Sequence, residues 1–351
     1  MNKKIGSVVA ATAVCAMLAT SALAAAPISV TIDGEYLSAA QAPVIQENRT
    51  LVPMRAIFEA LGAEVQWDAD SRSITATKGD TTIEMAIGQT EMTVDGKSVA
   101  LEVAPTILNN NTMVPVRAVA ESFEAQVDWD AEARQVVIST FPTKSLSESV
   151  TAEDGTVLLM LKATYPVLDN PDNDAGIAAI NAAFEKAAQD YLSSAKTEYT
   201  KEAQDFYAQR LAEGSADDFQ PYSFERAFSI KLDGTDLLSG VMTDYSFTGG
   251  AHPMTVKTGF TYDKSSGKAL TLDQAQEGAD KLREQAVAAF EAKIDAEPEL
   301  FFADAKTTVQ NEIQNAQFYL ADDGVHFLFQ LYDIAPYAAG FQEVTVAYPQ
   351  V

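Results

Sequence analysis

Hydrophobic and polar residues follow the same pattern twice in the first half of this chain. Residues 28–77 and 90–139 align without a gap, and the Asp-Gly pair at 33–34 recurs at 95–96, 62 positions later. In each copy, alternating residues run into this pair and predict a β-hairpin. A proline, apolar residues at helical spacing and two further alternating segments then predict a short helix and two closing strands. The constant period therefore indicates a duplicated unit of strand, strand, short helix, strand and strand.

Single residues predict where the short helix begins and ends. Pro53 suits the first turn of a helix, where its missing N–H is not needed. Gly62 suits the position after the last turn, where the backbone often takes a positive φ. In the second copy Glu124 replaces this glycine, so the second helix must end without one.

Eight matched positions of the two copies are predicted to be structural. They are Pro53, Arg55, Trp67 and Asp68 in the first copy, and Pro115, Arg117, Trp129 and Asp130 in the second. The tryptophans are expected to pack against the neighbouring helix, and the alternative is stacking on a sugar. The arginines are expected to pair with local acids or to cap carbonyl groups. The pairs Asp68 and Asp70, and Asp128 and Asp130, are spaced like those of a calcium loop but lack its glycine and its distal glutamate, so they are expected to form turns.

The second half of the chain has longer elements. Strands are predicted at 156–165, 228–232, 241–247, 254–262, 318–320, 325–331 and 344–348, with a hairpin turn at 322–324. An acidic loop at 169–174 could hold a cation, but it is expected to turn the chain and cap a long helix, which runs from Ile177 towards Leu211. A second amphipathic helix is predicted at 278–294. This order predicts an α+β domain with helices packed on an antiparallel sheet.

These patterns divide the chain into parts. Residues 1–24 are predicted to be a cleaved signal peptide, because Lys3 and Lys4 precede an apolar run that ends in Ala-Leu-Ala. The two repeats occupy 25–140, a linker is expected at 141–149, and the α+β domain occupies 150–351, with parts at 150–230 and 231–351. After removal of the signal peptide no membrane span is expected, because no other stretch approaches about 20 apolar residues.

Composition narrows the classes of function. The chain has 47% hydrophobic and 21% charged residues, as ordinary globular proteins do. Its one cysteine, Cys15, lies in the predicted signal peptide, which excludes disulfides and thiolate chemistry from the exported chain. The net charge is −26, and loss of Lys3 and Lys4 leaves 22 basic against 50 acidic residues, a net charge of −28. This charge repels nucleic acid and attracts cationic partners, although it also serves solubility.

One loop carries candidate chemistry. In the Thr-Gly-Gly-Ala-His-Pro segment at 248–253, the glycines let backbone N–H groups approach a ligand, and His252 could act as a base. The alternative is a turn or bulge between two strands. The sequence offers no nucleophile, base and orienting group around this histidine, so no catalytic residue, metal site or cofactor is predicted.

The repeated motif V-P-x-R-A-[IV]-x-E-x-[LF]…V-x-W-D resembles the copper amine oxidase-like N-terminal domain, also called a stalk domain. The resemblance covers about residues 28–140 and occurs twice in register. It implies a surface module of the kind common in exported proteins of Gram-positive bacteria. Copper in that oxidase is held by several histidines, and this region contains none, so the resemblance implies a non-catalytic role.

The segments Y-S-F-T-G-G-A-H-P, F-Y-L-A-D-D-G-V-H-F-L-F and Y-D-I-A-P-Y-A-A-G resemble a domain of unknown function. That domain forms the outer part of the lysozyme-sensing anti-sigma-V factor and precedes the catalytic domain of some peptidoglycan deacetylases. Residues 150–230 resemble its usual companion domain. In the anti-sigma factor this region binds lysozyme, a basic protein, which implies a cationic partner. Because only four residues precede the apolar run and no deacetylase domain is recognised, neither sigma-factor binding nor deacetylation is expected.

The sequence therefore favours an exported, non-catalytic binding protein, extracellular or associated with the cell wall. The expected partner is a cationic protein such as lysozyme, or a cell-wall glycan. The candidate ligand-binding residues are Thr248, Gly249, Gly250, His252, Tyr332 and Tyr337, with Phe341 as a further anchor. Core packing is the simpler expectation for these tyrosine and phenylalanine rings. The alternatives are a structural wall protein without a discrete ligand and a hydrolase of envelope polymers that uses His252 in acid–base roles.

Overall fold

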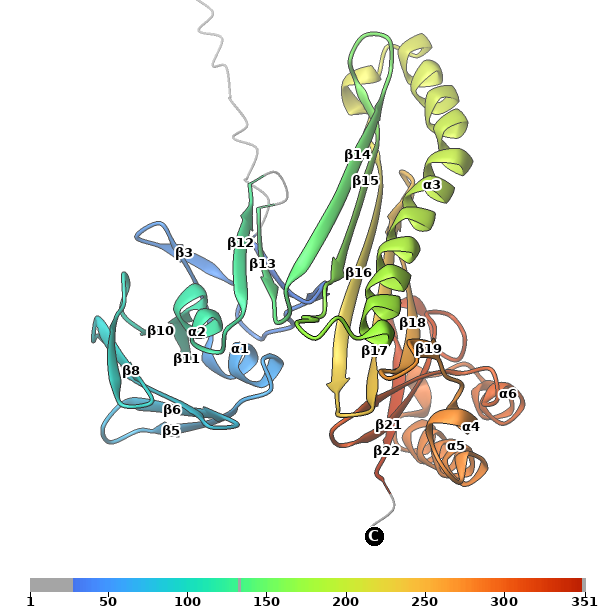
Figure 1. The fold of residues 1–351 in the computed structure, drawn as a ribbon. Coiled ribbons are helices and arrows are strands. Elements are labelled where there is room, and N and C mark those ends of the chain that lie inside the picture. The colour runs from blue at the N-terminus through green and yellow to red at the C-terminus, as the bar shows by residue number, and fades with distance from the viewer. Residues whose placement is uncertain (1–27, 132–133, 349–351) are drawn as a thin grey trace, which may run out of the picture.

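The computed structural model describes residues 28–131 and 134–348, which form two domains (Figure 1). The predicted signal peptide lies outside these residues. The strands and short helices up to Ser139 form the repeat domain, and the rest of the chain forms an α+β domain, so the predicted fold class is confirmed. In the described part of the chain, no helix is long and apolar enough to cross a membrane.

The two copies of the repeat contain the same elements. The first copy contains β1 (Ser29–Ile32), β2 (Glu35–Tyr36), β3 (Val44–Gln46), β4 (Arg49–Pro53), α1 (Met54–Ala60), β5 (Glu64–Asp68) and β6 (Ser73–Lys78). The second contains β8 (Glu91–Val94), β9 (Lys97–Ala100), β10 (Thr106–Leu108), β11 (Asn111–Pro115), α2 (Val116–Ser122), β12 (Gln126–Asp130) and β13 (Gln135–Ser139), and β7 (Thr81–Ala86) joins the copies. Each element of the second copy begins 62 residues after its counterpart, so the sequence repeat is a structural repeat.

A pseudo-two-fold axis relates the two copies. It passes through the antiparallel pair β4–β11, where Val52 lies opposite Val114, its own counterpart. Both valines are fully buried, and α1 and α2 follow directly after these strands. The apolar faces of the two short helices therefore meet in one shared core.

Each copy needs strands from outside itself to complete a sheet. β1 of the first copy pairs in parallel with β13 of the second, which gives the order β12-β13-β1-β2. β8 and β9 of the second copy extend the first copy through β7, which gives the order β5-β6-β7-β8-β9. The two copies are thus one folding unit with one core.

The short helices begin one residue later than predicted. Pro53 and Pro115 are the last residues of β4 and β11 and the N-caps of the helices, not residues of the first turn. Their φ angles of −59° and −68° suit extended backbone as well as helix, which allows this shift by one residue. Gly62 and Glu124 follow the C-caps with positive φ angles of 76° and 62°, so a glutamate takes the conformation predicted for the glycine.

The α+β domain begins earlier than predicted. β14 (Thr143–Thr151) pairs along its length with β15 (Val157–Pro166), so most of the linker predicted at 141–149 is a strand. The polar residues of this segment suggested a linker because β14 is an edge strand, which contributes only Leu146 and Val150 to the apolar core. The division predicted between residues 230 and 231 falls inside β16 (Tyr222–Asp233), so the domain is not split there.

Six strands form the main sheet in the order β14-β15-β16-β17-β18-β19. β17 (Leu237–Phe247), β18 (Met254–Asp263) and β19 (Lys268–Ala269) continue antiparallel from β16, whereas β15 and β16 are parallel. The crossover between these two parallel strands is α3 (Ala175–Ala212), which covers one face of the sheet (Figure 1). Asp174 in the predicted acidic loop caps α3, because its side chain accepts hydrogen bonds from the backbone N–H groups of Gly176 and Ile177.

A smaller sheet completes the α+β domain. Its strands are β20 (Gln317–Ala321), β21 (Gly324–Phe329) and β22 (Gln342–Val346), and its helices are α4 (Leu272–Ala275), α5 (Ala279–Ala296) and α6 (Ala305–Glu312). Short 3₁₀ turns lie at Ala216–Asp218, Pro298–Leu300 and Tyr337–Ala339. Phe290 of α5 packs against Phe329 of β21 in an apolar core between the helices and this sheet. The backbone N–H of Leu320 donates to the buried Ser239 Oγ at 2.9 Å, which joins the smaller sheet to β17.

Candidate functional site

The repeat domain lies on the polar face of the main sheet, and α3 lies on the other face (Figure 1). Strand alternation separates these faces, because alternate side chains point to opposite sides of a sheet. The residues that point away from α3 are Lys162, Thr164, Glu225, Ala227, Thr243, Tyr245, Thr255 and Lys257. Four neighbouring strands therefore present hydroxyl, carboxylate and ammonium groups to the repeat domain.

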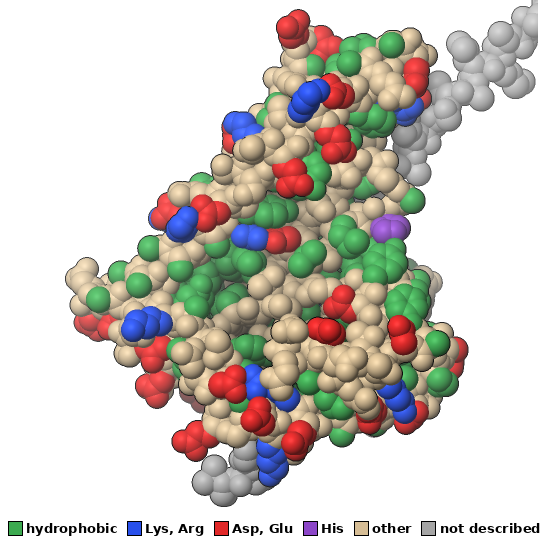
Figure 2. Space-filling view, turned by 90° about the vertical axis from the view of Figure 1, so that its right-hand side faces the viewer, with side chains coloured by type: hydrophobic (Ala, Val, Ile, Leu, Met, Phe, Trp, Pro, Cys, Tyr) green, Lys and Arg blue, Asp and Glu red, His purple; other side chains and the backbone are tan. Residues whose placement is uncertain are grey.

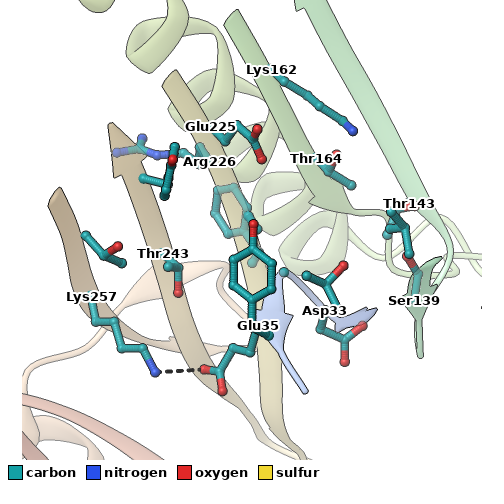
Figure 3. A pocket seen from close by; sticks show the side chains of 18 of the residues that line it. Asp33, Glu35, Ser139, Thr143, Lys162, Thr164, Glu225, Arg226, Thr243 and Lys257 are labelled. Carbon is teal, nitrogen blue, oxygen red and sulfur yellow. Dashed lines mark hydrogen bonds and ion pairs between the residues drawn. The ribbon is translucent and has the colours of Figure 1, made fainter. Parts of the chain in front are cut away.

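The β1–β2 hairpin is the part of the repeat domain that touches this face most closely. At its tip, a Cβ added to Gly34 would lie 2.0 Å from the Cβ of Ala227 in β16. The next residue, Glu35, accepts a hydrogen bond from Lys257 Nζ at 3.2 Å and lies 3.8 Å from Lys231 Nζ (Figure 3). A second ion pair joins Lys162 Nζ to Asp130 Oδ2 at 3.3 Å. Close packing and the ion pairs of Glu35 thus fix the hairpin against the sheet, and the Asp130 pair fixes β12 there.

A pocket of about 310 Å³ remains between the hairpin and the sheet (Figure 3). Its walls combine aromatic rings with hydroxyl and charged groups. The rings belong to Tyr36, Tyr245 and Phe341, and the charged side chains include Asp33, Glu35, Lys162, Glu225 and Lys257. This volume suits a small ligand or one side chain of a larger partner.

Glu225 is the unpaired carboxylate of this pocket. Within residues 28–131 and 134–348 it forms no hydrogen bond or ion pair, whereas Glu35 is paired with Lys257 and Asp33 accepts two hydrogen bonds from Thr140. The Glu225 side chain is exposed to the pocket. The surrounding protein still displaces part of the water around its carboxyl group, which raises its pKa more than the nearby charge of Lys162 lowers it. Burial also raises the pKa of Asp33, against the hydrogen bonds from Thr140.

Two tyrosine rings flank Glu225. Tyr245 lies directly opposite it on β17, and Tyr36 reaches it from the repeat domain. Burial raises the pKa of both phenols, and the charge of Glu225 raises both further, which indicates that both rings lie near its carboxylate. Tyr36 is 63% exposed, so its ring is accessible to a ligand.

Beside the pocket, three of the sequence-predicted residues come together. The His252 ring stacks on Tyr337 with the centroids 4.0 Å apart, and Tyr332 Oη lies 3.2 Å from His252 Nε2. Tyr332 is 45% exposed and has a φ of 70°, which is rare for a large side chain and is found at functional sites. Phe341, four residues after Tyr337, lines the pocket, whereas the three rings of this cluster are not among its lining residues. Figure 2 shows hydrophobic side chains gathered around a histidine on a surface that otherwise carries many acidic residues.

The other predicted residues of this loop are exposed. Thr248, Gly249 and Gly250 connect β17 to β18 without a strand bulge, and Gly249 has a φ of 80°. His252 Nδ1 lies 2.9 Å from the Pro253 carbonyl oxygen, so the loop itself orients the imidazole ring. Phe341, the further predicted anchor, is half-buried and lines the pocket, where Lys257 Nζ lies 5.0 Å from its ring centroid.

Sequence reasoning missed a second group of ionisable residues on the smaller sheet. His326 stacks on Tyr319 at 4.6 Å, and its two ring nitrogens lie 2.7 Å from Glu343 Oε1 and 2.8 Å from Asp323 Oδ1. Burial lowers the pKa of His326, but its contacts with Glu343 and Asp323 outweigh this effect, so the pKa is raised. Burial raises the pKa of Glu343, but hydrogen bonds from His326 and Tyr319 outweigh it, so the pKa is lowered. The members of this network satisfy one another, which favours a structural role.

The two tryptophans of the repeats differ in environment. Trp67 packs against the core of the repeat domain, whereas Trp129 is 42% exposed. Trp129 shares the inward face of β12 with the buried Val127, but a groove of about 1160 Å³ lies beside it in place of close packing. The expectation of core packing for both tryptophans is therefore wrong for Trp129.

The matched arginines and Asp68 make local contacts, whereas Asp130 pairs with Lys162 of the main sheet. Arg55 lies 3.4 Å from Glu59, and Arg117 lies 3.1 Å from Glu121, in each case one helical turn further on. Asp68 accepts hydrogen bonds from backbone N–H groups at 70 and 71, which lower its pKa and close a turn. In the parts of the chain that the structure describes, no three His, Cys, Asp or Glu side chains are grouped to hold a metal ion.

Comparisons with known families match three successive segments of the chain. Residues 31–138 match the copper amine oxidase N-terminal domain, residues 152–255 match deacetylase PdaC, and residues 270–349 match a protein family of unknown function, DUF3298. The predicted resemblances are confirmed in that order. Domains of this kind are typical of extracellular envelope proteins.

One curated relative and two solved structures are similar to the chain. A protein of Brevibacillus choshinensis named "Protease inhibitor" is 28% identical over 139 residues, which cover 38% of this chain and 43% of the relative, so less than half of the relative's length is matched. A DUF3298 family member from Bacteroides fragilis is 22% identical with a TM-score of 0.42, and covers 59% of this chain and 90% of that chain. A DUF3298 family protein from Pseudomonas aeruginosa is 21% identical with a TM-score of 0.38, and covers 60% of this chain and 91% of that chain.

Proposed function

We propose that this chain is an exported, non-catalytic binding protein of the cell envelope, and that its α+β domain engages a cationic protein such as lysozyme. The observation that carries this proposal is the cluster of His252, Tyr332 and Tyr337, in which the imidazole stacks on one tyrosine and contacts the hydroxyl of the other. Exposed rings of this kind act as anchors in protein interfaces, because they bury a large area at a low cost in side-chain entropy.

Charge and similarity support the same type of function. The chain carries a net charge of −26, which speeds the arrival of a cationic partner while the ring contacts set the rate of dissociation. The Brevibacillus relative is named a protease inhibitor, and this name is compatible with a binding role.

Calorimetry with lysozyme tests the proposal. The chain without its predicted signal peptide is titrated with lysozyme at low and at physiological salt, where screening acts over about 8 Å and weakens non-specific attraction. A one-to-one complex should persist at the higher salt. Tyr332→Ala should weaken it about tenfold or more, as truncation of an anchor does. The control is Leu211→Ala, which removes an exposed apolar side chain near the end of α3 and should leave the affinity unchanged.

Two outcomes would contradict the proposal. The first is loss of all lysozyme binding at physiological salt. The second concerns the non-catalytic role: release of soluble products from peptidoglycan by the wild-type chain, abolished in His252→Ala, would identify a hydrolase instead.

A specific observation favours cell-wall glycan as a second candidate ligand. The exposed Trp129 ring lies beside the groove of the repeat domain, together with Arg117 and Glu121, and stacking rings flanked by polar groups suit sugar faces. In this case Trp129→Ala should lower retention of the chain on insoluble peptidoglycan, and Trp129→Phe should preserve it. Equal retention of both variants and the wild type would exclude this ligand site.

A further inference from the structure

We propose that Glu225, Tyr36 and Tyr245 form a cage for one ammonium group in the pocket between the two domains. This inference rests on the proposed function only for the source of the ligand, since the cage itself is defined by the pocket. It assigns the pocket a chemical class of ligand, a primary amine in its protonated form.

The first argument is the pairing of charges in the pocket. Glu225 projects into it from β16 without an ion pair among the described residues (Figure 3). Lys162 of this pocket is engaged by Asp130 at 3.3 Å, and Lys257 is engaged by Glu35 at 3.2 Å. A carboxylate without a partner gains most from a ligand that brings its own positive charge.

The second argument is the position of the aromatic rings. Tyr245 lies across the strand pair from Glu225, and Tyr36 faces the same space from the hairpin of the repeat domain. Burial raises the pKa of both phenols, so both rings stay neutral and both hydroxyls keep a proton. A cation next to a carboxylate and over neutral aromatic rings gains from both contacts, and the gain grows as water is excluded.

The same groups disfavour an anionic ligand. An anion in this pocket would face Asp33 and Glu225. The cationic side chains among the described lining residues are already paired: Lys162 with Asp130, Lys257 with Glu35 and Arg226 with Asp244. The hydroxyl groups that surround the cage, among them Thr164, Thr243 and Thr255, can donate to or accept from the body of a ligand. The pocket therefore suits a cationic head on a body that carries polar groups.

Two sources supply this chemistry. One is a lysine side chain of a protein partner, and the other is an amino sugar whose nitrogen carries no acetyl group. Both bring one primary ammonium group, and about 310 Å³ accommodates either. Because Tyr36 and Glu225 belong to different domains, either ligand would also link the two domains.

Matched small molecules test the cage by NMR titration of the chain without its predicted signal peptide. Nα-acetyl-lysine amide is compared with Nα-acetyl-norleucine amide, and glucosamine with N-acetylglucosamine, so that each pair differs at the amine. The charged member of at least one pair should bind about ten- to a hundredfold more tightly, as one charge-assisted contact predicts. Glu225→Gln should abolish this difference, and Glu153→Gln, in the exposed turn between β14 and β15, should preserve it.

A second variant keeps the test independent of folding defects. Tyr36→Ser introduces the residue that the second copy has at the matched position, Ser98, and should weaken the charged probe without unfolding the hairpin. Preference for the lysine probe alone identifies a protein side chain as the source, and preference for glucosamine alone identifies an amino sugar. Equal affinity within both pairs, or a preference that survives Glu225→Gln, would overturn the cage.

Lysozyme binding is measured on the same samples, so that a failure of the cage can be distinguished from a failure of the proposed function. Lysozyme binding without any response to the amine probes would refute the cage and leave the proposed function intact. A response to the amine probes without lysozyme binding would refute the proposed partner and leave the cage intact.

Discussion

Gly34→Ala probes how the tip of the β1–β2 hairpin fixes the two domains. Gly34 has a φ of 80°, and an added Cβ would lie 2.0 Å from the Cβ of Ala227. Two carbon atoms in contact prefer a separation of about 3.5 Å or more, so the hairpin tip must withdraw by roughly 1.5 Å. Gly96 provides a matched control, because it occupies the same hairpin position in the second copy with a φ of 73° and nothing within 4 Å of an added Cβ.

The expected magnitudes separate backbone strain from domain packing. Alanine at a positive φ costs about 1–2 kcal/mol at either position. The overlap with Ala227 adds about 1–3 kcal/mol at Gly34 alone, as overpacking does in other interiors, unless the domains move apart to relieve it. Gly34→Ala should therefore lower the free energy of unfolding by about 2–5 kcal/mol, and Gly96→Ala by about 1–2 kcal/mol.

Urea unfolding and small-angle X-ray scattering measure the two effects. Scattering should show a larger radius of gyration for Gly34→Ala if the domains separate, and no change for Gly96→Ala. Ala227→Gly combined with Gly34→Ala should restore the wild-type scattering, because it removes the overlapping methyl group. Equal losses of stability in the two single variants, with unchanged scattering in both, would refute this account of the domain contact.

Three further changes have expected outcomes. Glu124→Gly should raise the free energy of unfolding by roughly 0.5–1 kcal/mol, because Glu124 is held at a φ of 62°. The urea midpoint should rise accordingly, and a lower midpoint would contradict this. Asp174→Ala should cost about 1 kcal/mol by removing the acceptor at the start of α3, whereas Asp174→Asn should retain most of the stability in the same unfolding assay. His326→Gln should lower the thermal midpoint most between about pH 4.5 and 6.5. Because the pKa of His326 is raised in the folded protein, its contribution to stability is complete below its unfolded pKa and is lost as the pH rises through its folded pKa. Because the pKa of Glu343 is lowered, its contribution is present above its unfolded pKa and is lost as the pH falls through its folded pKa. A difference in midpoint that does not vary with pH would contradict the assigned pairing.

Local signals in the sequence identified the repeat domain well. The period of 62 residues fixed the order of its elements, and the Asp-Gly pairs at 33–34 and 95–96 are the positive-φ hairpin turns they predicted. The acidic loop before α3 supplied its cap as expected. These successes share one cause, since turns and caps are determined by residues close together in the chain.

The predictions that failed depend on contacts between distant segments. The segment at 141–149 has a linker composition, and only its pairing with β15 makes it a strand. Trp129 is followed by the same Asp-Ala pair as Trp67, but the groove beside it leaves it exposed.

The candidate site was only partly visible from the sequence. His252, Tyr332 and Tyr337 were named individually, and their stacking depends on two loops 80 residues apart. The pocket was not predicted, because Tyr36 and Glu225 become neighbours only when the hairpin docks on the sheet. An alternating polar face on four strands was the available signal, and in an isolated sheet such a face is ordinarily solvent-exposed.

The parallel pairing of β1 with β13 gives the repeat domain a mechanical property. A pulling force applied at the start of β1 and at the end of β13 acts on opposite ends of one ladder, in which residues 29–32 pair with residues 135–138. In this geometry the strands must slide past each other, so the hydrogen bonds of the ladder carry the load together instead of opening one after another. A domain built in this way transmits tension from one end of the ladder to the other before it unfolds.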